Sequence, residues 1–120
     1  MIKVLKFGGT SVGSAANMKK VAEIVRREQA RITVLSAMSG TTDSLVRISR
    51  AAASGDRNAI EEQLAMLTDK YTRCIEELLR ERKQQALARM NATFGLIRDE
   101  AAAFEEYESE RKIIAQGELL

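Results

Sequence analysis

Two short stretches rich in glycine and hydroxyl side chains carry the residue types that chemistry would need. Residues 6–13 read Lys-Phe-Gly-Gly-Thr-Ser-Val-Gly, and residues 36–43 read Ser-Ala-Met-Ser-Gly-Thr-Thr-Asp. Glycines allow backbone amides to approach the oxygens of an anion closely, and a lysine ammonium group neutralises its charge. The two stretches together therefore predict a site for a phosphate or another anion.

The order of residues in the first stretch excludes the common phosphate-binding motifs. Lys6 precedes Gly8 and Gly9, whereas the P-loop places its lysine after the glycines, and the dinucleotide fingerprint G-x-G-x-x-G does not fit either. Taken alone, the first stretch is equally compatible with a tight turn beside a surface lysine. The second stretch is also compatible with a loop that ends in a helix cap, formed by Thr42 or Asp43.

The composition narrows the chemistry further. The chain has no histidine and one cysteine, which excludes Ser-His and Cys-His catalysis, histidine-ligated metals and an internal disulfide. Lys and Arg total 19 against 17 Asp and Glu, for a net charge of +2. With so little excess charge and no basic stripe, we expect no nucleic-acid binding. Cys74 lies in an apolar stripe and is expected to be a buried structural thiol.

The elements around the two stretches explain how they meet. Residues 2–7 and 31–36 are short, β-branched-rich runs that predict strands, and helical spacing of apolar residues at 18–25 predicts a helix between them. Strand, helix and strand in this order form a βαβ unit with parallel strands. Because adjacent parallel strands deliver their following loops to one edge of the sheet, Lys6 and Ser36 should lie at the same edge.

The rest of the chain reads as helical. A helix is expected from about Asp43 to a stop at Gly55, followed by a cap at Asp56 or Asn58 and a final helical segment from Ser109. Two apolar stripes lie between: Ile60, Leu64, Leu67, Tyr71, Cys74 and Leu78, then Leu87, Met90, Phe94, Ile97, Ala101 and Phe104. Between Leu78 and Leu87 a continuous helix would turn the apolar face by roughly 180°. We therefore predict a break within residues 79–86 and an antiparallel helical hairpin.

Two further expectations concern the whole protein. No stretch approaches the roughly 18 apolar residues of a membrane span, and no secretory leader precedes the first strand, so a cytoplasmic protein without membrane contact is expected. Two strands leave open edges and uncovered faces, which predicts that the natural protein continues after Leu120.

At this point a family resemblance becomes specific. Residues 6–13 resemble the opening motif of the aspartate kinases, residues 34–43 resemble that family's second-strand motif, and residues 116–119 (Gln-Gly-Glu-Leu) resemble its third. The resemblance implies the amino-acid kinase fold, an αβα sandwich around a mostly parallel sheet, of the carbamate kinase-like α/β class. It also implies ATP-dependent phosphorylation, with Mg²⁺, of the side-chain carboxylate of L-aspartate. That reaction is the first step toward lysine, threonine and methionine.

The resemblance also implies roles for individual residues. Lys6 matches the catalytic lysine and, with Phe7, Gly8 and Gly9, the phosphate-binding turn. Ser36 matches a nucleotide contact, and Thr42 and Glu118 match aspartate contacts. An aspartate carboxylate is already ionised at neutral pH, so its phosphorylation needs charge neutralisation and positioning but no histidine base.

The same resemblance identifies residues 1–120 as the N-terminal part of a catalytic domain. Residues 1–55 would carry the phosphate loops and residues 56–120 a helical region, while the remaining kinase domain and the regulatory ACT domains would lie outside the chain. We accordingly expect no turnover from this chain alone, and a homo-oligomer for the full-length protein. Fusion to a homoserine dehydrogenase is left open.

Two other functions are alternatives. Acetylglutamate, glutamate, carbamate and uridylate kinases share the fold, but their glycine-rich openings usually lack the Thr-Ser-Val continuation seen at residues 10–12. A non-catalytic helical interaction module would rest on residues 58–108, which carry apolar stripes and no obvious site.

Overall fold

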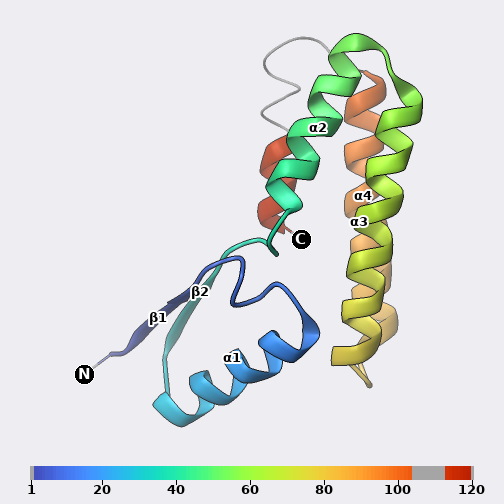
Figure 1. The fold of residues 1–120 in the computed structure, drawn as a ribbon. Helices are drawn as coiled ribbons and strands as arrows, with labels where there is room; N and C mark the ends of the chain where they lie inside the picture. Colours follow the sequence, from blue (N-terminus) through green and yellow to red (C-terminus); the bar gives the residue numbers. More distant parts are fainter. Residues whose placement is uncertain (1, 104–112, 120) are drawn as a thin grey trace.

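The computed structural model describes residues 2–103 and 113–119, with residues 118 and 119 given by their backbone alone. Figure 1 shows a small sheet with one helix alongside it, and a separate group of packed helices at the other end of the molecule. In chain order the elements are β1 Val4–Phe7, α1 Ala15–Glu28, β2 Ile32–Leu35, α2 Thr41–Ser54, α3 Arg57–Leu78, α4 Lys83–Ala102 and the short 3₁₀ helix η1 Gln116–Leu119.

The N-terminal unit is a βαβ motif, as predicted. Strands β1 and β2 are parallel, with Val4 opposite Ile32 and Phe7 opposite Leu35. Helix α1 begins after Ser14, whose Oγ accepts a hydrogen bond from the Asn17 amide at 3.1 Å. This register brings the loops that follow the two strands to the same edge of the sheet.

Local residue chemistry sets the ends of α2 and α3. Helix α2 begins at Thr41, two residues before the predicted start, because Gly40 adopts a left-handed conformation with φ of 84° and turns the chain out of β2. It ends at Ser54 and is capped by Gly55, which has φ of 74°. Of the two candidate caps for α3, Asp56 is the one used, since its Oδ1 accepts from the Ala59 amide at 3.1 Å.

The helical hairpin is confirmed. Helix α3 ends at Leu78 and α4 begins at Lys83, so the break falls inside the predicted window. The two helices run side by side in opposite directions (Figure 1). The ring of Tyr71 on α3 meets Phe94 on α4 edge-on, with centroids 5.8 Å apart.

One hydrophobic core joins α2, α3 and α4, with contributions from α1 and the C-terminal segment. Its most deeply buried side chains are Leu45, Ile48, Leu64, Ile97 and Ile113. Both predicted apolar stripes face this core, with Leu78 and Leu87 at its margin. Residues 113–115 are helical as expected, whereas Phe104 and residues 109–112 lie outside the described residues.

The strands contrast with this core. Ile2, Val4, Ile32, Val34 and Leu35 are 46–62% exposed, and the sheet has two strands in the described part of the chain. None of the helices described here is long and apolar enough to cross a membrane.

Candidate functional site

The two glycine-rich loops pack directly against each other. The Ser36 amide donates to the Phe7 carbonyl at 3.0 Å, and the Ser39 amide donates to the Gly9 carbonyl at 3.1 Å. A Cβ atom on Gly9 would lie 2.9 Å from the Ala37 carbonyl oxygen. This contact is too short for a side chain, so glycine at position 9 lets the loops approach.

A second glycine serves the same approach. A Cβ atom on Gly13 would lie 2.7 Å from Ser39 Oγ and 3.1 Å from the Gly9 carbonyl oxygen. Ser39 of the second loop therefore packs into a space that two glycines of the first loop leave open. The two motifs form one structural unit.

A hollow of about 320 Å³ opens beside this unit. It is lined by Gly9, Ser36, Ala37, Met38, Ser39, Gly40, Thr42 and Asp43. The hollow thus brings together three of the predicted site residues, namely Gly9, Ser36 and Thr42. It also lies at the N-terminal end of α2, where free backbone amides and the helix dipole favour an anion.

Lys6, Phe7 and Gly8 reach the same edge without lining the hollow. Lys6 pairs in register with Val34, one residue before the end of β1, which confirms its predicted place beside Ser36. Its side chain is exposed and, among the described residues, has no hydrogen-bond or ion-pair partner. Phe7 is half-buried and Gly8 is exposed. The backbone of β1 thus places Lys6 at this edge of the sheet, and the ammonium group of Lys6 is available to a ligand.

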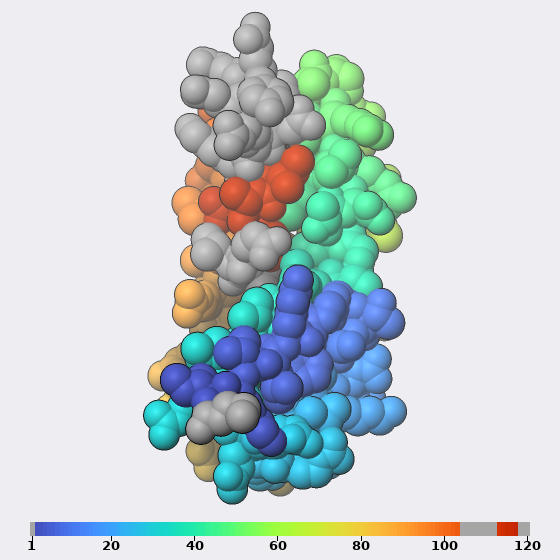
Figure 2. All heavy atoms as spheres, turned by 90° about the vertical axis from the view of Figure 1, so that its left-hand side faces the viewer, coloured from blue at the N-terminus to red at the C-terminus, as the bar shows by residue number. Residues whose placement is uncertain are grey.

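The third motif packs on the start of α2. A Cβ atom on Gly117 would lie 2.8 Å from Leu45 Cδ1 and 3.8 Å from Thr41 Cγ2, so η1 contacts the first turn of α2 closely. Residues 113–119 and the first motif lie on one face of the molecule, the former in red and the latter in blue (Figure 2). The backbone of Glu118, the next residue after Gly117, is therefore close to the N-terminal part of α2, and the structure does not describe its side chain.

Two residues of α3 support the second loop, and neither was predicted to act at the site. Lys70 Nζ donates to the Ser39 carbonyl oxygen. The Tyr71 hydroxyl lies 2.7 Å from Thr41 Oγ1. Burial raises the pKa of Tyr71, and its hydrogen bonds to Thr41 and the Met38 backbone oppose that rise. A signal for Tyr71 did exist, because a tyrosine in a buried stripe needs a partner for its hydroxyl.

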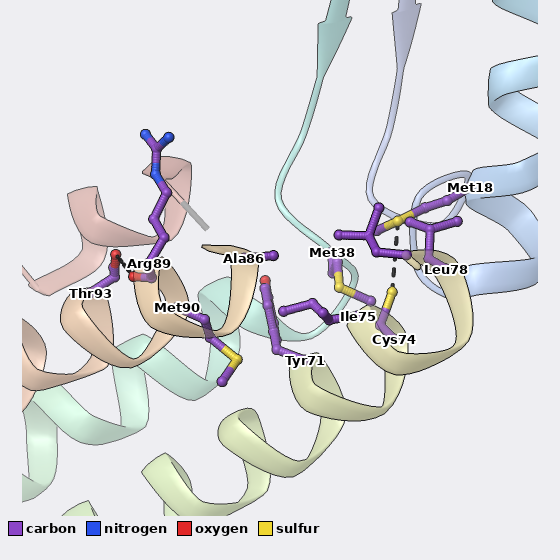
Figure 3. A pocket seen from close by; sticks show the side chains of 11 residues that line it. Met18, Met38, Tyr71, Cys74, Ile75, Leu78, Ala86, Arg89, Met90 and Thr93 are labelled. Atoms are coloured by element: carbon purple, nitrogen blue, oxygen red, sulfur yellow. Dashed lines mark hydrogen bonds between the residues drawn. The ribbon is translucent and has the colours of Figure 1, made fainter. Parts of the chain in front are cut away.

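An apolar hollow of about 240 Å³ lies behind the second loop (Figure 3). Met38 from that loop, Met18 from α1 and Cys74 from α3 contribute sulfur atoms to its lining, and Cys74 Sγ lies 3.7 Å from Met18 Sδ. Burial raises the pKa of the Cys74 thiol, with a smaller contribution from the charge of Glu77. Cys74 is buried, as predicted for a structural thiol.

Comparison with known proteins assigns the family. The sequence model of the amino acid kinase family matches residues 1–118. The chain belongs to the amino acid kinase family. Among curated members it is 42% identical over 79 residues to aspartokinase 1, chloroplastic, of Arabidopsis thaliana, and 39% identical over 75 residues to the aspartokinase of Chlamydia muridarum. Each match covers 62% of this chain, and 14% and 16% of those relatives respectively.

Solved structures of the same family confirm the fold. Aspartokinase III of E. coli in complex with lysine and aspartate matches with a TM-score of 0.86 and 25% identity, over 98% of this chain. The same enzyme with aspartate and ADP matches with a TM-score of 0.77 and 27% identity, over 99% of this chain. The chain spans 26% of each of those structures. Its βαβ unit and helices are thus part of the αβα sandwich of amino acid kinases.

Proposed function

We propose that this chain is the N-terminal part of the catalytic domain of an aspartate kinase. The observation that carries the proposal is the packing of Ser39 against Gly9 and Gly13. This packing joins the two loops into one edge suited to an anion, in a chain that is 39–42% identical over 75–79 residues to curated aspartokinases. The enzyme as a whole would transfer the γ-phosphoryl group of ATP to L-aspartate.

The reaction is an in-line displacement at phosphorus. An oxygen of the aspartate side-chain carboxylate attacks the γ-phosphorus, the bond from that phosphorus to the β,γ-bridging oxygen breaks, and ADP leaves with the bonding electrons. The products are 4-phospho-L-aspartate and ADP. The carboxylate is already ionised, so the protein's tasks are to align two anions and to stabilise the charge of the moving group.

The described residues fit these tasks by position. Lys6, exposed and without a protein partner in the described chain, would neutralise charge on the moving phosphoryl group. Phe7, Gly8 and Gly9 would form the phosphate-binding turn. Ser36, on the second loop, would contact the nucleotide.

Thr42 and Glu118 would bind aspartate. Thr42 lines the hollow at the start of α2, where helix amides favour a carboxylate of the substrate. Glu118 would pair with the substrate ammonium group, and the packing of Gly117 on Leu45 brings its backbone to the same end of α2.

Mg²⁺ would enter with ATP. Among the described residues no group of three or more Asp, Glu, His or Cys side chains could hold a metal ion. Mg²⁺ in kinase sites needs no such cage, since phosphate oxygens and waters supply most of its ligands. Asp43 is a carboxylate lining the hollow and fits the small protein share of such a site.

The proposal includes the division of the chain. Residues 1–55 would carry the phosphate loops, and residues 56–120 would form the helical support. Against a separate interaction module, α3 packs on both α2 and α1 and reaches the second loop through Lys70 and Tyr71. We further propose a cytoplasmic, homo-oligomeric enzyme in the biosynthesis of lysine, threonine and methionine.

A substrate panel tests the proposal. The full-length protein is incubated with ATP, Mg²⁺ and one candidate substrate at a time, and ADP release is followed. The candidates are aspartate, glutamate, N-acetylglutamate, carbamate and UMP. Hydroxylamine traps any acyl phosphate as a hydroxamate. We expect ADP release and hydroxamate with aspartate alone. Turnover with another substrate in place of aspartate would assign a sister activity, and no turnover with any would contradict the proposal.

A further inference from the structure

Lys70 on α3 lies outside every motif, yet it bonds to the backbone of the second loop. Its Nζ donates to the Ser39 carbonyl oxygen, and a Cβ atom on Gly40 would lie 3.9 Å from it. We propose that Lys70 is a positioning residue for aspartate binding, which holds the Ser39–Gly40 peptide in the orientation that the hollow requires. The inference rests on the proposed function.

The surroundings of Lys70 separate it from an ordinary solvated lysine. Its neighbours Asp69 and Arg73 are exposed and pair with each other at 3.3 Å. Lys70 itself is half-buried and reaches across to a residue 31 positions earlier in the chain. The ammonium group thus bonds to the loop although a carboxylate is next to it in sequence.

The peptide geometry explains what this bond does. The Ser39 carbonyl and the Gly40 amide belong to one trans peptide, so they point in opposite directions. A carbonyl held toward α3 therefore turns the Gly40 N–H away from α3. Among the described residues this N–H donates to no acceptor, and Gly40 lines the hollow. The Gly40 N–H is therefore free to donate to a ligand oxygen, and the bond from Lys70 to the Ser39 carbonyl holds its orientation.

The next residue of α3 holds the chain just after that peptide. The Tyr71 hydroxyl bonds to Thr41 Oγ1. With Lys70 on Ser39, two points of the chain immediately before Thr42 are fixed by consecutive residues of one helix. Loss of the Lys70 bond would free the Ser39–Gly40 peptide while Tyr71 keeps the core packing in place.

Lys70→Met in the full-length protein tests the inference. We expect the apparent KM for aspartate to rise about tenfold, the factor of one hydrogen bond to a charged group, with kcat changed less than about threefold. Amide hydrogen exchange of the peptide spanning residues 36–44 should become faster. Lys70→Arg, which keeps the charge and the donor, should restore KM to within about threefold of the wild type. Lys20→Met, which removes an exposed lysine of α1, should change neither measurement.

The outcomes are distinct. Unchanged hydrogen exchange in Lys70→Met would overturn the inference, and so would faster exchange with an unchanged KM for aspartate, because Lys70 would then support the loop without acting on the site. A wild-type enzyme that does not phosphorylate aspartate would overturn the proposed function and, with it, the role in aspartate binding. The exchange data would still show whether Lys70 orders the loop.

Discussion

The Tyr71 hydroxyl and Thr41 Oγ1 form a buried hydrogen bond of 2.7 Å between α3 and the first residue of α2. Thr41 is fully buried and Tyr71 is 5% exposed. Because Thr41 directly follows the second glycine-rich loop, this bond connects the helical hairpin to the loop. The hairpin is therefore part of the framework of the site.

Removing one partner of this bond should destabilise the protein. Tyr71→Phe keeps the ring contact with Phe94 but leaves the Thr41 hydroxyl buried without that partner. We expect the free energy of unfolding, measured by urea denaturation, to fall by about 1–2 kcal/mol. In the double variant with Thr41→Val both polar groups are gone, so the coupling energy should be about 1 kcal/mol. Additive effects of the two substitutions would show that the bond contributes nothing.

Gly9 and Gly8 make a matched pair for testing the packing of the two loops. A Cβ atom at Gly9 meets the Ala37 carbonyl at 2.9 Å, whereas one at Gly8 meets nothing within 4 Å. Gly9→Ala should lower the free energy of unfolding by about 1–3 kcal/mol through overpacking against backbone. Gly8→Ala should change it by less than about 0.5 kcal/mol. Thermal denaturation of both variants measures the two changes in the free energy of unfolding. Equal changes would refute the close approach of the loops.

Cys74 should react slowly with thiol reagents in the folded protein. Its raised pKa reduces the thiolate fraction at neutral pH, and burial blocks access. We expect labelling by a disulfide reagent at pH 8 to take far longer than in urea, and to speed up as the pH rises further. The comparison is internal, because the same thiol is measured folded and unfolded. Rapid labelling of the folded protein would contradict the packing of Cys74 against Met18.

Lys6→Ala in the full-length enzyme should lower kcat by about 10²–10³, the usual effect of losing one preorganised charge in the transition state. The apparent KM for aspartate should change little, because the charge matters most as the phosphoryl group moves. Lys6→Arg should restore little activity, since a planar guanidinium does not replace a compact ammonium group. Steady-state kinetics with circular dichroism as a folding control provide the measurement. A wild-type kcat in Lys6→Ala would exclude the catalytic assignment.

Thr42→Val and Glu118→Gln are the contrasting variants. Both should raise the apparent KM for aspartate while the KM for ATP stays nearly constant, because these residues are assigned to the amino-acid substrate. Initial rates measured over a matrix of both substrates separate the two constants. If Thr42→Val raised only the KM for ATP, Thr42 would be assigned to nucleotide binding instead of aspartate binding.

The sequence was most informative where periodicity and glycine placement agree. The phase reversal between Leu78 and Leu87 predicted the hairpin break, because a continuous helix would have exposed one stripe. The β-branched runs at both strands, the first followed by Gly8-Gly9 and the second by the small residues 37–42, predict the parallel pair and the shared edge. These features depend on contacts that the residue pattern encodes directly.

Other features depended on tertiary geometry. Helix α2 begins at Thr41, two residues before the start that the sequence predicts, because the left-handed conformation of Gly40 ends the loop there and residue types alone do not fix that conformation. The sequence contains no sign that Lys70 contacts the second loop, because a lysine in a charged helical segment has the same sequence pattern whether it faces water or a carbonyl oxygen. Ser39 fits against Gly9 and Gly13 only once both loops are folded, so residue types alone did not reveal that contact.

The exposed strands have a consequence for the order of folding. Contacts among α2, α3 and α4 join neighbouring segments of the chain and close early, since short loops cost little entropy. Strands β1 and β2, with apolar side chains such as Val4 and Val34 still half in water, cannot form a stable sheet as a pair. During synthesis the helical half would therefore consolidate first. While the two strands stay unpaired, their exposed backbone groups and apolar side chains would make them the aggregation-prone part of the nascent protein and a binding site for a chaperone.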